Sequence, residues 1–174
     1  MVDAARVQGF RASGLFQTSQ SLSGIANSRA MWGWDADTKA DYSTTVHGPA
    51  GSGKAAQSQS AHERLDVAHL TRTAVESARL GQGPRPMEPG DHTVIFEPLA
   101  LLGLLGFMAW ALDAREADEC SSVLSGTLGR QLLHPLATLG LDTVDLELPA
   151  PTMGQSGQAI ETTRWIDAGV VKSV

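Results

Sequence analysis

The residues best suited to chemistry are His62, Glu63 and His69. A His-Glu pair followed by a second histidine is a pattern that can bind zinc. Zinc-binding histidines of that pattern lie four residues apart, about 6 Å along a helix, so that both rings reach one ion. His62 and His69 are seven residues apart, roughly 10 Å along a helix axis, and no third ligand is evident nearby. The spacing favours helix-start or helix-surface positions and leaves the three residues as weak metal candidates.

A second motif, GPAGSGKA over residues 48–55, differs by one residue from a phosphate-binding P-loop. In a P-loop the residue after the lysine carries a hydroxyl that binds magnesium, and Ala55 has none. The polar residues 56–60 that follow also lack the apolar periodicity of the helix that a P-loop requires. We therefore predict a flexible hairpin tip here.

Four acidic residues lie next to Cys120, the only cysteine of the chain. Paired carboxylates can act in acid–base catalysis, but a group of acids after an apolar helix usually forms a solvated cap. A single cysteine excludes an internal disulfide and a cluster of thiolate zinc ligands. The sequence thus offers no catalytic constellation, and we predict no catalytic or cofactor-binding residue. The acidic residues are Asp113, Glu116, Asp118 and Glu119.

Composition limits the partners of this 174-residue chain. Hydrophobic content of 42% and charged content of 18% are typical of a globular protein. A net charge of −6 and the absence of a basic run argue against nucleic acid binding. The longest apolar run, Leu99–Leu112, is too short to cross a membrane, and no secretory signal is recognisable, so a cytoplasmic location is the default expectation.

Residues 1–60 carry short alternating segments that predict an antiparallel β meander. We expect turns at Asn27-Ser28 and at Asp35–Asp37. Trp32 and Trp34 are expected in the core or at its rim, with a binding surface as the alternative. The period then changes, and residues 61–80 favour an amphipathic helix.

The middle of the chain predicts a buried strand followed by a buried helix. Thr93–Phe96 is rich in β-branched and aromatic side chains, and Glu97-Pro98 marks the start of a helix that is apolar on every face. Gly103 and Gly106 weaken that helix, so we expect another backbone to approach closely there.

The final third, residues 132–174, predicts a strand over Thr143–Leu148 and a hairpin around Asp167-Ala168-Gly169. Strands, then helices, then strands again indicate an α+β fold. We expect one domain or a fragment of a larger protein, with a meander over residues 1–60, a helical and strand core over 61–131 and a mixed region over 132–174. Because the sequence stops inside the last predicted strand, a truncated chain is expected.

Five short motifs, in the same order along the chain, resemble the TldD/PmbA family, whose members are also described as modulators of DNA gyrase. Each is weak alone, and together they are spread over nearly all of the sequence. They are residues 26–29 (similar to ANS-x-G), 44–53 (TVR-x-x-x-GTGSG), 94–98 (VVLEP), 125–129 (SG-x-LG) and 165–171 (LIENGVV).

The resemblance also implies a departure from the catalytic members. TldD-type members carry a His-Glu-x-x-x-His zinc motif in the helix after the VVLEP strand. The matching positions here are Gly106, Phe107 and Ala111, which cannot bind a metal. The chain therefore resembles the TldE (PmbA) branch, whose members pair with a TldD subunit to form a zinc protease that processes unfolded peptides.

On this basis we expect a non-catalytic subunit with no cofactor of its own, zinc in a TldD-like partner, an unfolded peptide as substrate, and no nucleic acid or membrane partner. A homo-oligomer is left open. Two alternatives also stay open. One is an active metallopeptidase with a non-standard site built from His62, Glu63, His69 or Cys120. The other is a binding or scaffold module without a proteolytic role.

Overall fold

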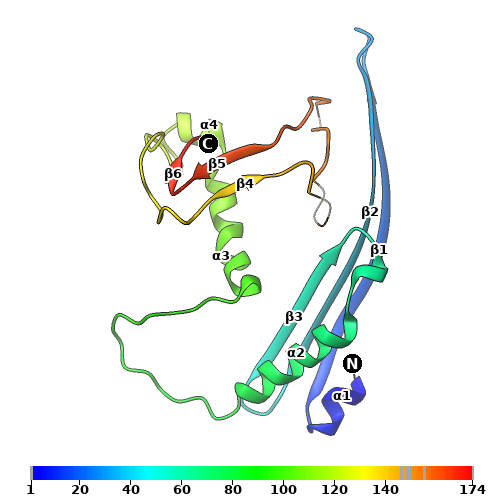
Figure 1. Cartoon of the computed structure of the whole chain (residues 1–174), viewed down its shortest axis with the longest axis vertical. Coiled ribbons are helices and arrows are strands. Elements are labelled where there is room, and N and C mark those ends of the chain that lie inside the picture. The colour runs from blue at the N-terminus through cyan, green and yellow to red at the C-terminus, as the bar shows by residue number, and fades with distance from the viewer. Residues whose placement is uncertain (1, 146, 148–149, 155, 174) are drawn as a thin grey trace. The chain divides into compact units, whose positions relative to one another are not determined.

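The computed structural model describes residues 2–145, 147, 150–154 and 156–173. It contains two compact units, which meet in the sequence between Val94 and Ile95. Each unit has a three-stranded antiparallel sheet together with helices (Figure 1). The α+β fold expected from the sequence is confirmed.

The first unit is organised around a long hairpin. Strands β1 (Arg11–Ala26) and β2 (Trp32–His47) each have 16 residues and pair over their whole length. Strand β3 (Ser52–Gln59) pairs only with residues 40–47 of β2, in the order β1-β2-β3. The predicted meander is therefore confirmed, although its first two strands are longer than the short segments expected.

The predicted turn at Asp35–Asp37 is wrong, because these residues lie inside β2. Asp35 faces Ser23 and Asp37 faces Ser21 on β1, and the Ser21 hydroxyl donates a hydrogen bond to the Asp37 carboxylate. This polar face lets acidic residues lie within a strand. The turn at Asn27-Ser28 is confirmed, since the Asn27 side-chain oxygen accepts the N–H groups of Arg29 and Met31.

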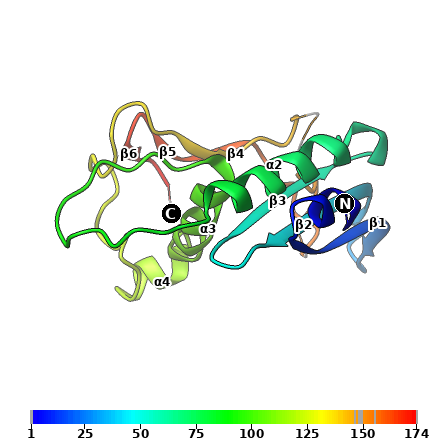
Figure 2. The same ribbon diagram turned by 90° about the horizontal axis from the view of Figure 1, so that it is seen from below.

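Helix α2 (Val67–Leu80) packs on the sheet beside the short helix α1 (Val2–Val7) (Figure 2). It begins later than the sequence suggested, because the Asp66 carboxylate caps it by accepting the N–H of His69 at 2.8 Å. The preceding residues form a single turn of 3₁₀ helix, η1 (His62–Arg64). The core between α2 and the sheet is built from small or medium side chains, including Ala5, Val46, Ala55, Ala74 and Ala78.

The second unit contains helix α3 (Pro98–Ala111), which starts at Glu97-Pro98 as predicted. Its predicted burial is wrong: no residue of α3 is buried, and Phe107 and Trp110 are exposed. Nothing lies within 4 Å of a Cβ placed on Gly103 or Gly106, so the expected close backbone approach is wrong too. A helix is buried only where another element packs against it, and the apolar composition of the helix does not specify that element.

The predicted buried strand over Thr93–Phe96 is also wrong. These residues are exposed, Ile95 at 93%, and they belong to no strand of the described chain. A strand is stable only when a neighbour takes up its backbone hydrogen bonds. β-branched and aromatic residues alone therefore did not suffice here.

The second sheet contains β4 (Leu139–Leu141), β5 (Thr163–Asp167) and β6 (Val170–Val171), in the order β4-β5-β6. The C-terminal hairpin is confirmed, and Ala168 and Gly169 both have positive φ angles, 47° and 79°, as its two-residue turn requires. Helix α4 (Ala114–Asp118) follows α3.

The strand predicted over Thr143–Leu148 is wrong where the structure describes it. Thr143 and Val144 lie in a turn, and the Asp142 side chain accepts the N–H of Val144 at 3.0 Å. Leu146 and Leu148 lie outside the described residues. The strand of this region, β4, ends one residue before Asp142.

A buried hydrogen bond between Tyr42 of β2 and Thr71 of α2 yields a prediction for stability. The two hydroxyl oxygens are 2.9 Å apart, and both residues are buried. Either Tyr42→Phe or Thr71→Val leaves one buried hydroxyl without its partner, which should lower the free energy of unfolding by about 1–3 kcal/mol. The double variant leaves neither, so in urea unfolding it should cost less than the sum of the single variants. Strictly additive costs would contradict this interaction.

Candidate functional site

His62 and Glu63 lie together in η1, with His62 Nδ1 3.4 Å from Glu63 Oε2. Both side chains are exposed. His69 lies in the first turn of α2, where its side chain is also exposed. Across the described residues, no three or more His, Cys, Asp or Glu side chains are grouped so that they could hold a metal ion. The structure thus places His62 and Glu63 side by side, and among the described residues no third metal ligand is grouped with them.

The three positions that the sequence resemblance assigned to the family's zinc motif lie in the second half of α3. Gly106 and Phe107 are exposed, and Ala111 is the last residue of the helix. The ring of Phe107 packs edge-on against Trp110, with ring centroids 5.8 Å apart. None of these side chains carries a nitrogen, oxygen or sulfur atom. The donor set therefore does not fit a zinc ion at these positions.

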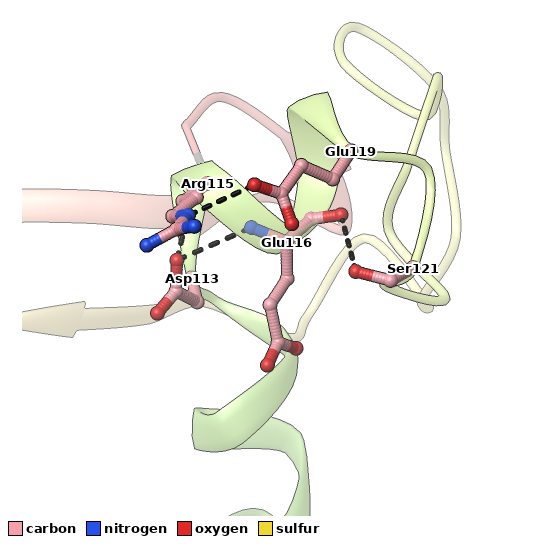
Figure 3. A network of polar contacts seen from close by, with 5 residues as sticks. All are labelled: Asp113, Arg115, Glu116, Glu119 and Ser121. Atoms are coloured by element: carbon pink, nitrogen blue, oxygen red, sulfur yellow. Dashed lines mark hydrogen bonds and ion pairs between the residues drawn. The ribbon is translucent and has the colours of Figure 1, made fainter.

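The acidic residues after α3 form the cap of a short helix (Figure 3). Asp113 accepts the N–H groups of Arg115 and Glu116 at 2.9 and 3.3 Å and so begins α4. Arg115 pairs with Glu119 at 2.9 Å, and the Ser121 hydroxyl donates to the Glu116 carbonyl at 3.0 Å. This is the solvated cap expected from the sequence: the Asp113 carboxylate binds backbone N–H groups, and the Glu119 carboxylate binds the Arg115 guanidinium.

The near P-loop at residues 48–55 is the turn between β2 and β3 together with the start of β3. Gly48 closes the turn, its N–H donating to the Gly51 carbonyl at 2.8 Å. A Cβ on Gly53 would collide with the backbone of Ala74 and Ala78, and one on Gly51 would meet the backbone of Gly81. The glycines thus allow α2 to pack closely on β3. The predicted hairpin is confirmed, and its flexibility stays a prediction.

A polar hollow of about 350 Å³ lies where η1 meets the hairpin. Gln20, Lys39, His62 and Glu63 are among its lining residues. Beside it, Asp41 accepts a hydrogen bond from Ser58 and lies 3.2 Å from the Lys39 ammonium, and both contacts lower the pKa of its carboxyl. Asp41 is therefore charged at neutral pH, and Lys39 is partly neutralised by it.

An apolar groove of about 600 Å³ lies farther along the hairpin, and Leu22, Ile25, Trp32 and Trp34 are among its lining residues. Trp32 is 71% exposed and Trp34 57% exposed, so neither belongs to the core. The prediction of core or rim aromatics is wrong, and the alternative of a surface that could bind is the one the exposure supports. An alternating strand that includes Ala36 and Ala40 would have placed both tryptophans on the face that carries the core positions, but only the structure shows that α2 does not cover them.

Comparison with known proteins identifies the class of protein. Residues 89–174 match the model of the PmbA/TldA metallopeptidase C-terminal domain, and the chain belongs to this TldD/PmbA family. The family expected from the sequence motifs is therefore confirmed. No curated protein matches the chain in sequence.

Solved structures share the fold. TldE from Thermococcus kodakarensis is 18% identical with a TM-score of 0.88, covering 99% of this chain and 41% of its own. Proteins described as candidate modulators of DNA gyrase also match. The one from Thermotoga maritima is 18% identical (TM-score 0.85, 92% of this chain, 38% of its own), and the one from Bacteroides thetaiotaomicron is 19% identical (TM-score 0.79, 93% and 38%). The chain thus spans about two fifths of the length of these structures.

No membrane crossing is found in the part of the chain that the structure describes, where every helix is too short or too polar to span a bilayer.

The contact of Gly53 with α2 yields a prediction. Gly53→Ala should push α2 away from β3 and lower the free energy of unfolding by about 1–3 kcal/mol, measured by urea unfolding. Gly103→Ala is the matched control, since open space surrounds Gly103 and alanine raises helix propensity. A stable Gly53→Ala variant would show that β3 and α2 are not packed as described.

Proposed function

We propose that the chain serves as a non-catalytic, TldE-like subunit of a zinc metallopeptidase complex that processes peptides. The observation that carries this proposal is the chemistry of Gly106, Phe107 and Ala111 in α3. These residues stand where the catalytic members carry two histidines and a glutamate, and none has a ligand atom. Similarity in fold to the TldE of Thermococcus kodakarensis supports the same branch.

The zinc and the groups that activate water would then belong to a TldD-like partner subunit. Metal-assisted peptide hydrolysis needs three protein ligands and a general base arranged around one ion. In this chain the nearest comparable pair, His62 and Glu63, is exposed and lies on η1. We therefore assign no step of the hydrolysis to this chain, and its contribution is binding and assembly.

The surface supports a role in assembly. Leu102, Phe107 and Trp110 of α3 are exposed at 62%, 71% and 76%, and the helix carries no charged side chain along its length. Large exposed apolar patches on soluble proteins usually mark contacts with another protein surface. A subunit that works only in a complex would carry such a surface.

The proposal predicts that this chain and a TldD-like subunit contribute different functions to one complex. When this chain and a TldD-like subunit are mixed, they should co-purify, and an unfolded peptide should be cleaved in a reaction that a chelator abolishes. The chain alone should cleave nothing, and zinc titration followed by calorimetry should show no tight stoichiometric site. His62→Ala and His69→Ala should leave the activity of the mixture unchanged.

The two alternative functions of the chain predict different results in the same experiment. Cleavage by the chain alone that is lost in His62→Ala, together with tight zinc binding, would identify an active metallopeptidase and overturn the proposal. Failure to associate with the TldD-like subunit would instead favour a scaffold module without a proteolytic role. Localisation in the cytoplasm stays a prediction, which fractionation of the native cells tests.

A further inference from the structure

The hairpin of the first unit leaves one strand edge open. β3 pairs with β2 only from Ala40 to His47, so within residues 2–94 no strand pairs with that edge of β2 from Trp32 to Asp37. In an antiparallel strand every second residue directs both its N–H and its C=O to the same edge. The segment therefore presents backbone donors and acceptors to any extended chain that lies beside it.

The two faces of this segment differ in chemistry. Trp32, Trp34 and Ala36 lie on the face that continues the core positions Ala40 and Tyr42, and Leu22 lies opposite Ala36 on β1. α2 and η1 cover the core positions, whereas Leu22 is 76% exposed. The apolar face of the hairpin thus extends beyond its covering helices and forms the groove of about 600 Å³.

The opposite face of the same segment carries two acidic residues, with Ile25 of β1 opposite Gly33. Asp35 and Asp37 alternate with the tryptophans along β2 and face Ser23 and Ser21 across the hairpin. A strand added at the open edge would place its own side chains beside these two faces in turn. Opposite charges stabilise such cross-strand pairs and like charges destabilise them, so lysine or arginine is favoured beside the aspartates and apolar residues beside the tryptophans.

A second copy of this chain fits the edge poorly. If two β2 edges paired in an antiparallel way with their apolar faces on the same side, the acidic positions of one copy would face the acidic face of the other. The edge therefore suits a ligand that carries positive charge.

We infer that the open edge of β2 from Trp32 to Asp37, with the groove beside Leu22, Trp32 and Trp34, binds an unfolded peptide substrate in which apolar and basic residues alternate. The peptide adds as a strand to the hairpin, with its apolar side chains in the groove and its basic side chains beside Asp35 and Asp37. Strand addition gives affinity through the backbone and selects for the pattern through the side chains. The claim that the bound peptide is a substrate rests on the function proposed above.

The probe is a fluorescein-labelled nine-residue peptide in which valine and lysine alternate. Its binding to the purified chain alone is measured by fluorescence anisotropy. We expect saturable binding that Trp34→Ser weakens at least tenfold. Met87→Ser, which removes an exposed apolar side chain outside the groove and outside α3, is the control and should leave the affinity unchanged. Circular dichroism shows whether each variant keeps its fold. Replacing the central valine of the peptide by proline should also abolish binding, because proline cannot donate to the strand edge.

The charge reversal Asp35→Lys/Asp37→Lys distinguishes loss of the binding site from unfolding of the chain. It should weaken binding of the lysine peptide at least tenfold and create binding of a peptide with glutamate at the lysine positions, a gain that an unfolded variant cannot give. Absence of binding, or equal affinity of the original chain for the lysine and glutamate peptides, would overturn the inference. Since neither zinc nor a partner subunit is present, these outcomes are independent of complex formation and proteolysis, which test the proposed function separately.

Discussion

The continuous register between β1 and β2 is the constraint on which the first unit depends. It runs without a shift from the Arg11–His47 pair to the Ala26–Trp32 pair. A strand alternates its faces residue by residue, so this register decides that Val46, Tyr42 and Ala40 face α2 and that Trp34 and Trp32 face the same way farther out. Helix α2 and η1 cover only the first part of that face. The core and the exposed groove are therefore two stretches of one amphipathic surface.

The fold could be predicted where local pattern and pairing agree. The Asn27 turn, the start of α3 at Glu97-Pro98 and the Ala168-Gly169 turn each follow from a side chain or backbone angle that acts locally. The failures concern burial and pairing between distant segments. The apolar composition of Leu99–Leu112 indicates a helix but does not say what covers it, and Asp35–Asp37 indicated a turn because the serines that face the two aspartates lie on another strand.

For the candidate site too, the sequence predicted side-chain chemistry but not the contacts between distant segments. Sequence alone excludes zinc ligands at Gly106, Phe107 and Ala111, because side-chain chemistry needs no coordinates. It also rejected the near P-loop through the missing hydroxyl at Ala55, and the structure adds the reason for the glycines, which is the close approach of α2 to β3. The exposed groove beside Trp32 and Trp34 could not be found without knowing where β3 and α2 end, since the two tryptophans are as compatible with a core as with a surface.

Hydrogen exchange of the free chain, resolved for single amides of β2, tests the open edge most directly. Within Ala40–His47 both edges of β2 are paired, so all amides should be protected. Within Trp32–Asp37 protection should alternate, because only the residues that face β1 have a hydrogen-bond partner. Uniform protection there would show that the edge is already covered, and uniformly fast exchange would show that the hairpin does not extend to Trp32; either result would contradict this account of the chain.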